Sequence, residues 1–153
     1  MNGFHLINGA GMGTMLSVAK AFTDISNRKG LSIGIVPSKD FCDSSKNRQL
    51  YSSPQSYPNP YIEIPIRTHL PLSGNQGLKL ACRNHIIILT ANIVVALPGA
   101  SGTRSEIQLC LDYKKPLIIL DPTNCWEEFK NSPAILVKDV QKTINLLKSF
   151  FRC

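Results

Sequence analysis

The stretch IVVALPGASGTRSEIQLCLDYKKPLIIL, residues 93–120, decides the fold, because it joins two apolar strands through a small-residue loop and a helix. The β-branched run 93–97 predicts a strand that is buried on both faces of a parallel sheet. The loop 98–102 has no bulky side chain, so its backbone can approach a ligand closely. The helix that follows ends before Pro116, which separates it from a second buried strand at 117–120.

The loop 98–102 and the start of the next helix are predicted to bind phosphate. Unpaired N–H groups and the positive end of the helix dipole lie at a helix N-terminus, where an anion is the natural occupant. A purely structural alternative stays open, because Thr103 and Glu106 also fit a capping box, in which both side chains satisfy backbone donors. The expected phosphate contacts are Gly99, Ser101, Gly102 and Thr103, with Pro98 as a further ligand contact.

A second glycine loop lies near the start of the chain. Residues 4–8 are a short strand candidate, and NGAGMGTM, residues 8–15, supplies a glycine loop that leads into a helix and then a buried strand at 31–36. Ligands of parallel sheets lie at the carboxyl ends of strands, so this loop is predicted to bind the same phosphate. Its expected contacts are Gly11, Gly13 and Thr14. Apolar residues at helical spacing predict that the helix packs on a sheet: Met15, Val18, Ala19, Phe22 and Ile25.

The middle of the chain combines an irregular segment with two further elements. Residues 37–60 contain four prolines and no periodicity, which is typical of a mobile segment or of a lid over a site. Residues 61–66 favour a strand that a proline confines to a sheet edge. Residues 77–92 are predicted to be helical, with Arg83 and Asn84 near the middle of the helix, because no turn separates them from the next strand.

The C-terminal part continues the alternation of strands and helices. A loop after residue 120 leads to a poorly defined segment around Trp126 and then to a short strand at 135–137. This alternation predicts a Rossmann-like α/β fold, a parallel sheet with helices on both faces, as a single nucleotide-binding domain over residues 1–153. A last helix begins at Asp139, and its apolar stripe consists of Val140, Ile144, Leu147 and Phe151.

Composition favours an ordinary globular protein. The chain has 153 residues, 43% of them hydrophobic and 18% charged, and is long enough to bury a real core. No apolar stretch is long enough to span a bilayer and no secretory leader is recognisable, so a cytoplasmic protein without a membrane partner is expected. The net charge of +7 is spread along the chain, which argues against nucleic acid as a partner and agrees with small anionic ligands.

The cysteines are predicted to be reduced, and most of them to be packing residues. Their number is odd, no pair has CxxC spacing, and the three histidines do not cluster near them in the sequence. This pattern predicts neither a disulfide framework nor a metal site. The five are Cys42, Cys82, Cys110, Cys125 and Cys153.

Both glycine loops carry a resemblance to a known superfamily. The run 98–106, Pro-Gly-Ala-Ser-Gly-Thr-Arg-Ser-Glu, resembles the hallmark Pro-Gly-Gly-x-Gly-Thr-x-x-Glu of the LONELY GUY phosphoribohydrolases, formerly labelled lysine decarboxylases, and of the molybdenum cofactor carrier proteins, departing at Ala100. Arg83 matches the arginine of their preceding helix. The segment NPYIEIPIRT, residues 59–68, and the Arg83-Asn84 pair resemble the carrier-like nucleotide-binding branch. The first loop matches at Gly9, Gly11, Gly13, Met15, Val18 and Ala19.

The resemblance also implies an assembly and a difference from relatives. Relatives are commonly homodimers, so a homodimer is expected. Met1 lies where relatives begin their second strand, so the family's first strand and the helix after it are expected to be missing from the sheet. An unpaired strand edge of that kind favours association.

Two functions follow from the resemblance, and both use the same loops. The first is a carrier-like protein that binds a nucleotide or a molybdopterin-type ligand and requires no cofactor; the branch resemblance favours it. The second is hydrolysis of a nucleoside 5′-monophosphate to base and ribose 5-phosphate, so whether the chain is an enzyme stays open. In the hydrolase, Glu106 would stabilise the oxocarbenium-like sugar and orient water, and Arg83 would bind phosphate or ribose oxygens. Asn84 is a further ligand contact.

Arg83 and residues 9–13 each have a further interpretation. For Arg83, the structural alternative is a salt bridge to an acidic neighbour. A dinucleotide-dependent oxidoreductase is disfavoured, because residues 9–13 have Gly-x-Gly-x-Gly spacing and the next strand ends without the acidic residue that binds a ribose.

Overall fold

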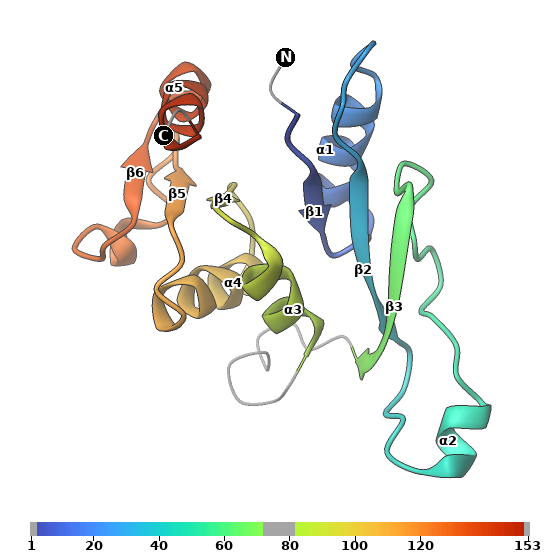
Figure 1. The fold of residues 1–153 in the computed structure, drawn as a ribbon. Coiled ribbons are helices and arrows are strands. Elements are labelled where there is room, and N and C mark those ends of the chain that lie inside the picture. Colours follow the sequence, from blue (N-terminus) through green and yellow to red (C-terminus); the bar gives the residue numbers. More distant parts are fainter. Residues whose placement is uncertain (1–2, 72–81, 152–153) are drawn as a thin grey trace. The chain divides into compact units, whose positions relative to one another are not determined.

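The computed structural model describes residues 3–71 and 82–151. The chain divides into two compact units, the first made of residues 1–73 and 80–87 and the second of residues 74–79 and 88–153. Parallel strands alternate with helices in both, which confirms the predicted α/β class (Figure 1). Each unit has its own three-stranded sheet, so the single domain over the whole chain stays a prediction.

The first unit is built on a parallel sheet with the strand order β1-β2-β3. β1 and β2 begin and end close to the predicted strands, and α1 connects them. The edge strand expected from a proline-containing run is β3, which pairs with β2. The elements are β1 (Leu6–Asn8), α1 (Thr14–Thr23), β2 (Ser32–Ser38), α2 (Ser45–Gln49), β3 (Ile64–Pro71) and the first part of α3 (Arg83–Thr90).

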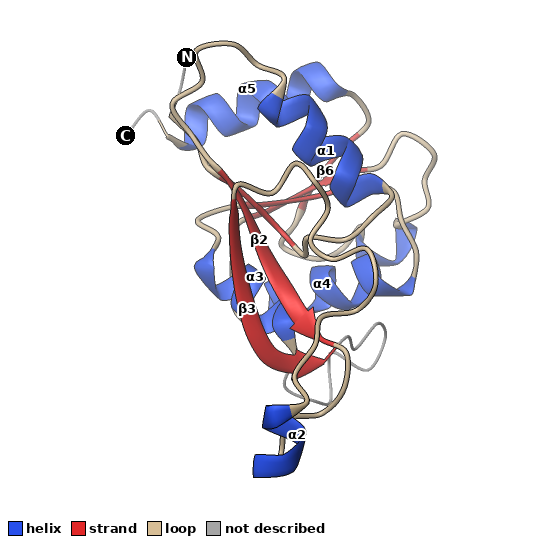
Figure 2. Ribbon diagram, turned by 90° about the vertical axis from the view of Figure 1, so that its right-hand side faces the viewer, coloured by secondary structure: helices blue, strands red, loops and turns tan. Residues whose placement is uncertain are grey.

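Two predictions for this unit were wrong in detail. The irregular segment 37–60 contains α2, which begins after Ser44, whose hydroxyl accepts a hydrogen bond from Asn47 N–H at 3.1 Å. Figures 1 and 2 show α2 away from the sheet. Arg83 is the first residue of α3 and does not lie near the middle of a helix. The apolar run that follows indicates a helix, but it has no capping residue to mark where the helix begins; positions 77–81 lie outside the described residues.

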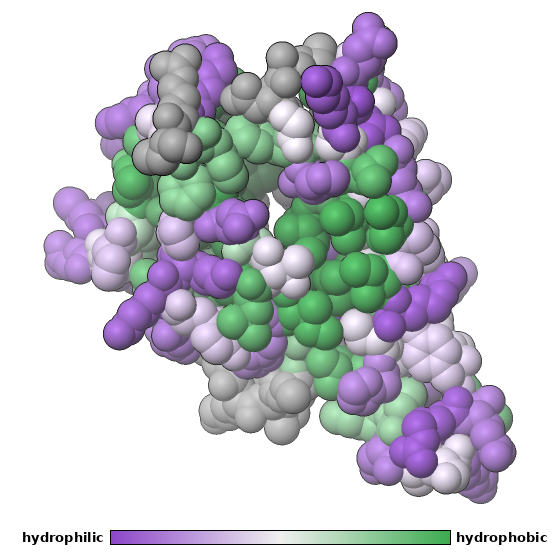
Figure 3. Space-filling view, viewed as in Figure 1, coloured by the Kyte–Doolittle hydropathy of each residue, from purple (hydrophilic) through white to green (hydrophobic). Residues whose placement is uncertain are grey.

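One face of the first sheet is only partly covered. Residues opposite one another in a parallel pair point to the same face, so Ile33, Ile35, Ile64 and Ile66 share one face. Ile35 is buried, whereas Ile64 and Ile66 are 40% and 44% exposed. Figure 3 shows apolar side chains gathered over β2 and β3. Parallel sheets are usually buried on both faces, and this one departs from that pattern.

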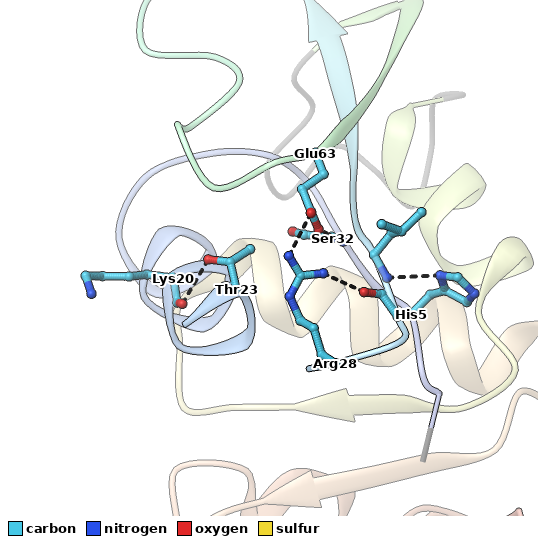
Figure 4. Close-up of polar contacts among 8 residues, drawn as sticks. His5, Lys20, Thr23, Arg28, Ser32 and Glu63 are labelled. Atoms are coloured by element: carbon cyan, nitrogen blue, oxygen red, sulfur yellow. Dashed lines mark hydrogen bonds and ion pairs between the residues drawn. The ribbon is translucent and has the colours of Figure 1, made fainter. Parts of the chain in front are cut away.

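Glu63 ties the start of β3 to the start of β2 (Figure 4). Its carboxylate accepts hydrogen bonds from Arg28 Nη2 at 2.7 Å and from Ser32 N–H at 2.8 Å. The hydrogen bond from Arg28, and then that from Ser32 N–H, hold the pKa of Glu63 below its ordinary value of 4.5. Beside them, Leu31 N–H donates to His5 Nδ1 at 3.2 Å.

We expect Glu63→Gln to destabilise the protein at neutral pH and to have a smaller effect in acid. The folded carboxylate has the lower pKa, so its contribution is complete above pH 4.5 and is lost as the pH falls through the folded pKa. Urea midpoints measured at pH 7 and pH 3 should differ from wild type mainly at pH 7. Asp24→Asn, in an exposed ion pair with Lys20, is the control and should change little. Equal effects of Glu63→Gln at both pH values would show that the ionised carboxylate of Glu63 is not what stabilises the fold.

The second unit contains a parallel sheet with the strand order β4-β5-β6. The predicted strands at 117–120 and 135–137 are confirmed with the same bounds. The predicted start of the last helix is also confirmed, because Asp139 is its N-cap and accepts a hydrogen bond from Lys142 N–H at 2.7 Å. After the end of α3, the elements are β4 (Val94–Ala96), α4 (Ser101–Asp112), β5 (Leu117–Leu120), η2 (Glu127–Phe129), β6 (Ile135–Val137) and α5 (Val140–Phe150).

A cluster of buried apolar side chains from α4, the sheet and η2 forms the core of this unit. Burial, and then the nearby Glu106, raise the pKa of the Cys110 thiol to about 12, so this thiol is neutral and acts as a packing residue. Cys82 is likewise buried, whereas Cys125 is exposed and is not a packing residue. None of the four cysteines in the described residues forms a disulfide, and Cys153 lies outside them.

The apolar stripe of α5 is less covered than that of α1. Leu147 is half-buried, whereas Val140 is 60% and Ile144 37% exposed. α5 packs against β5 and β6, and a three-stranded sheet leaves part of such a stripe in solvent. Within the described residues, no helix combines the length and apolar character that crossing a membrane requires.

Candidate functional site

The first glycine loop, residues 9–13, leaves the carboxyl end of β1 and leads into α1. Three successive carbonyl oxygens of this loop accept hydrogen bonds from the protein, so they are turned toward its interior. The pairs are Arg83 Nη1 to Gly9 O, Asn59 N–H to Ala10 O at 2.9 Å, and Asn59 Nδ2 to Gly11 O at 2.8 Å.

The carbonyl oxygens of this loop have hydrogen-bond partners, whereas several of its N–H groups have none in the described residues. Those of Gly11, Met12 and Gly13 have no acceptor among residues 3–71 and 82–151. Gly13 is the N-cap of α1 and offers no side-chain cap, and the first turn of this helix holds no acidic residue. The positive end of the α1 dipole is therefore not compensated by these residues, and the loop presents donors, as an anion site requires.

Arg83 is a buried cation with only neutral partners in the described part of the chain. Its side chain reaches the carbonyl oxygen of Gly9 and, at 3.5 Å, that of Ile35, and its guanidinium lies 5.2 Å from the centre of the Tyr57 ring. The alternative of a salt bridge to an acidic neighbour is wrong for the described residues, since none of their carboxylates pairs with it. Asn84, the next residue, is also buried.

Two glycines of the first loop make room for protein side chains. A Cβ added at Gly9 would lie 2.8 Å from Arg83 Cζ, and one added at Gly11 would lie 2.6 Å from the Tyr57 hydroxyl oxygen. Gly13 is different, because its φ of +66° lies in the left-handed region that favours glycine. Each glycine thus has a structural reason for its place, in addition to any ligand.

The second glycine loop joins β4 to α4 in the second unit. α4 begins at Ser101 and its N-cap is Ala100, which has no side-chain cap, so Thr103 is the third residue of the helix. The capping box with Thr103 as N-cap is therefore wrong. The Thr103 hydroxyl instead lies against the loop, because a Cβ at Gly99 would come within 2.3 Å of its Oγ1. Glu106 lies half-buried one turn further along.

The start of α4 also presents free donors. The N–H groups of Ser101, Gly102 and Thr103 have no acceptor within the described residues, and the first hydrogen bond of the helix runs from Arg104 N–H to Ala100 O at 3.1 Å. No acidic residue lies in the first turn. This helix end is thus a second uncompensated positive dipole end.

An open pocket of about 440 Å³ lies at the start of α4. One wall is formed by the second glycine loop and the first turn of α4, and the other by the end of the loop after β5 and by η2. Arg104 of α4 forms an ion pair with Glu128 of η2. The lining residues are Gly99, Ala100, Ser101, Arg104, Cys125, Trp126, Glu127 and Glu128.

Asp121 holds the second wall of this pocket in place. It directly follows β5, is 3% exposed, and accepts hydrogen bonds from Cys125 N–H at 2.8 Å, Trp126 N–H at 3.0 Å and Cys125 Sγ at 3.1 Å. Burial raises the pKa of Asp121, but the hydrogen bonds from Trp126 and Cys125 outweigh it and hold that pKa below its ordinary value. The carboxylate thereby fixes Cys125 and Trp126 at the pocket.

The predicted site residues fall into two groups. Gly11, Gly13 and Thr14 lie at the first loop, beside Arg83; Gly99 and Ser101 line the pocket of the second unit, with Gly102 and Thr103 in the same turn. Pro98 and Glu106 are not among the residues that line that pocket. The sequence analysis did not identify the residues that contact the first loop or form the rest of the pocket. For Asp121, the available signal was the turn-forming run Asp-Pro-Thr-Asn that directly follows a predicted strand. The missed residues are Tyr57, Asn59, Arg104, Asp121, Cys125, Trp126, Glu127 and Glu128.

Comparisons with known proteins agree with this architecture. The model of the family LDcluster4, described as SLOG cluster4 family, matches residues 1–146. No curated protein sequence matches the chain. The match confirms the resemblance to the superfamily of LONELY GUY and molybdenum cofactor carrier proteins.

Solved structures that share the fold include the following three. The structural genomics target TM1055 is 19% identical, with a TM-score of 0.68 over 96% of this chain and 79% of its own. The molybdenum cofactor carrier protein of Chlamydomonas reinhardtii is 22% identical, with a TM-score of 0.66 over 96% and 77%. The molybdenum cofactor binding protein of Rippkaea orientalis is 26% identical, with a TM-score of 0.65 over 97% and 78%. These similarities confirm the Rossmann-like class.

Proposed function

Because the chain belongs to the SLOG cluster4 family, we propose that it binds a phosphorylated small molecule, a nucleotide or a molybdopterin-type cofactor, and acts as a carrier. One observation carries this proposal. The first glycine loop has three carbonyl oxygens bound by Arg83 and Asn59, while three of its N–H groups have no acceptor in the described residues. Such an array of donors at a helix N-terminus suits a phosphate group.

Arg83 supports an anionic ligand for a second reason. A charge removed from water is costly unless it is paired or well hydrogen-bonded, and the Arg83 guanidinium has carbonyl oxygens and an aromatic ring as partners but no carboxylate in the described part. A phosphate on the first loop would add the missing negative charge. Arg83 would then have two roles: it holds the carbonyl of Gly9 and raises the positive potential at the loop.

The second unit supports the same class of ligand. Three N–H groups at the start of α4 have no acceptor in the described residues, because the N-cap Ala100 has no capping side chain. A pocket of about 440 Å³ lies beside them. Ligand sites commonly have volumes of about 300–1,000 Å³. Two structural neighbours are named as a carrier and as a binding protein of the molybdenum cofactor, which favours binding without chemistry. As the resemblance implies, we also propose a homodimer, which light scattering would detect as twice the chain mass.

Acidic substitutions at each helix start test phosphate binding and separate the two loops. Thr14→Asp and Ser101→Asp place a carboxylate in the first turn of α1 and α4, where it should stabilise the helix by about 0.3–1 kcal/mol. The same carboxylate would repel a phosphate, so affinity for ribose 5-phosphate, measured by calorimetry, should fall at least tenfold while the melting temperature holds or rises. Thr14→Asn and Ser101→Asn have nearly the same shape without the charge and are the matched controls. Unchanged affinity in both Asp variants would overturn the proposal.

The alternative function is hydrolysis of the N-glycosidic bond of a nucleoside 5′-monophosphate. It is favoured by Glu106, a half-buried carboxylate on the helix that begins at the second glycine loop. The wild-type protein would be incubated with AMP and GMP and the free base followed by chromatography. Release that is lost in Glu106→Gln would establish the hydrolase, whereas binding without release supports the carrier.

A further inference from the structure

We propose that Tyr57 is a ligand-binding residue of the first glycine loop, whose hydroxyl donates a hydrogen bond to the phosphate and whose ring positions Arg83 beside it. The inference rests on the proposed function, because it requires an anion at the N–H groups of this loop. It assigns a part in ligand binding to the irregular segment 37–60, which the proposed function does not use.

The segment that contains Tyr57 lies directly against the first loop. Asn59 donates a hydrogen bond from its backbone to Ala10 O at 2.9 Å and one from its side chain to Gly11 O at 2.8 Å. The Tyr57 side chain packs on the same glycine, because a Cβ added at Gly11 would lie 2.6 Å from the hydroxyl oxygen and 2.9 Å from Cζ. The hydroxyl is therefore next to Gly11, whose N–H has no acceptor within the described residues.

The Tyr57 hydroxyl has no hydrogen-bond partner within residues 3–71 and 82–151. The three carbonyl oxygens of the loop already accept hydrogen bonds from other donors. The side chain is half-buried, so part of it stays accessible to a ligand. A phenol hydroxyl can donate to a phosphate oxygen, and hydrogen bonds to a charged acceptor are stronger than those between neutral groups.

Arg83 provides an independent indication of an anion at this place. The residue is 7% exposed, and in the described part of the chain only its Nη1 has acceptors, the carbonyl oxygens of Gly9 and Ile35. Nη2 lies against the loop, since it is 2.8 Å from a Cβ added at Gly9. Buried polar groups in folded proteins are nearly always hydrogen-bonded. A phosphate on the loop would supply both an acceptor for Nη2 and the opposite charge.

The ring of Tyr57 holds the guanidinium in this position. Arg83 Cζ lies 5.2 Å from the ring centre, close enough for a cation–π interaction. Binding orders flexible side chains at a cost in entropy, and a ring that already restricts the guanidinium reduces this cost. Tyr57 therefore contributes in two separable ways, through its hydroxyl to the phosphate and through its ring to the position of Arg83.

Two substitutions at Tyr57 separate these contributions. Tyr57→Phe keeps the ring and removes the hydroxyl, so affinity for ribose 5-phosphate, measured by calorimetry, should fall about tenfold, as expected for a lost hydrogen bond to a charged group. Tyr57→Leu also removes the cation–π interaction and should lower the affinity about threefold further. Tyr61→Phe is the matched control, because this half-buried tyrosine lies over Lys20, at 5.7 Å, and should bind like wild type.

The stability of the ligand-free protein distinguishes binding from a structural role. The hydroxyl has no partner to lose in the described residues, so Tyr57→Phe should leave the urea midpoint unchanged. A lower midpoint with unchanged affinity would show that the hydroxyl supports the fold, and would overturn the inference. Equal losses of affinity in Tyr57→Phe and Tyr61→Phe would overturn it as well.

Double substitutions test where the hydroxyl acts. Ser101→Asp blocks the helix start in the second unit, and Tyr57→Phe should keep its full effect in that background. Thr14→Asp blocks the first loop, so Tyr57→Phe should cause no further loss there, and complete loss of binding in Thr14→Asp alone would equally support the first loop. An undiminished effect of Tyr57→Phe in the Thr14→Asp background would overturn the inference.

The results separate the inference from the function on which it rests. If the wild-type protein binds neither ribose 5-phosphate nor AMP, the proposed function fails. If the wild-type protein binds ribose 5-phosphate and Tyr57→Phe binds it equally well, the inference is overturned and the proposed function stands.

Discussion

Gly30→Ala is expected to prevent stable folding of the first unit. A Cβ at this buried position would lie 1.5 Å from the carbonyl oxygen of Phe4 and 2.5 Å from its carbonyl carbon. Both are backbone atoms, so no side-chain rotation relieves the clash. The chain would have to separate the start of β1 from that of β2, which the hydrogen bond from Leu6 N–H to Leu31 O holds at 3.0 Å. The free energy of unfolding should therefore fall by more than the loss of about 1–3 kcal/mol that is typical of overpacking.

Urea unfolding followed by circular dichroism would measure this effect. Gly102→Ala is the matched control, because an added Cβ at this helical position meets no atom within 4 Å. It should stabilise the protein by about 0.5–1 kcal/mol, as alanine does when it replaces glycine in a helix. A Gly30→Ala protein with the wild-type midpoint would show that β1 and β2 do not approach each other as described.

Asp121→Ala should be the most damaging change in the second unit. It removes the acceptor of three donors, Cys125 N–H, Cys125 Sγ and Trp126 N–H. The Trp126 N–H is buried, and a buried donor left without an acceptor costs about 1–3 kcal/mol. The two Cys125 donors are partly exposed and should add less. The loop after β5 would also lose its fixed conformation, and with it one wall of the pocket.

The effect of Asp121→Ala is measurable in both stability and binding. The urea midpoint should fall strongly, and affinity for ribose 5-phosphate should fall even in conditions where the variant remains folded. Asp121→Asn keeps one acceptor oxygen and should lose less. Asp112→Ala, at an exposed position of α4, is the control and should change the stability by less than about 0.5 kcal/mol. A midpoint shift as small for Asp121→Ala as for Asp112→Ala would mean that the three donors find other acceptors.

The parts of the fold predicted best were those set by local chemistry. The buried run 117–120 is a strand because its residues are apolar and Pro116 separates it from α4, and the last helix begins after Asp139 because that side chain caps it. The start of α3 was placed wrongly. Its apolar residues indicate a helix, but the residues before Arg83 contain no Ser, Thr, Asp or Asn that would mark an N-cap close by.

The site was predicted less completely, because its partners are distant in the sequence. The two glycine loops were located by their composition and by the helices that follow them. Asn59 and Tyr57 were not found, since they belong to a proline-rich run without periodicity and meet the first loop only in the folded chain. The glycines themselves were attributed to ligand approach, whereas Gly9 and Gly11 also leave space for Arg83 and Tyr57.

Asn59 is bound to the first loop by two hydrogen bonds, so the long connection between β2 and β3 has two parts that differ in how well they tolerate changes in length. Its backbone N–H and its side chain donate hydrogen bonds to the carbonyl oxygens of Ala10 and Gly11. An insertion or deletion close to this residue would therefore displace the first glycine loop. The stretch around α2 has no buried residue and no such anchor. Tags, labels or additional peptide are therefore best accommodated at α2, and evolution would be free to lengthen the chain there without disturbing the first glycine loop.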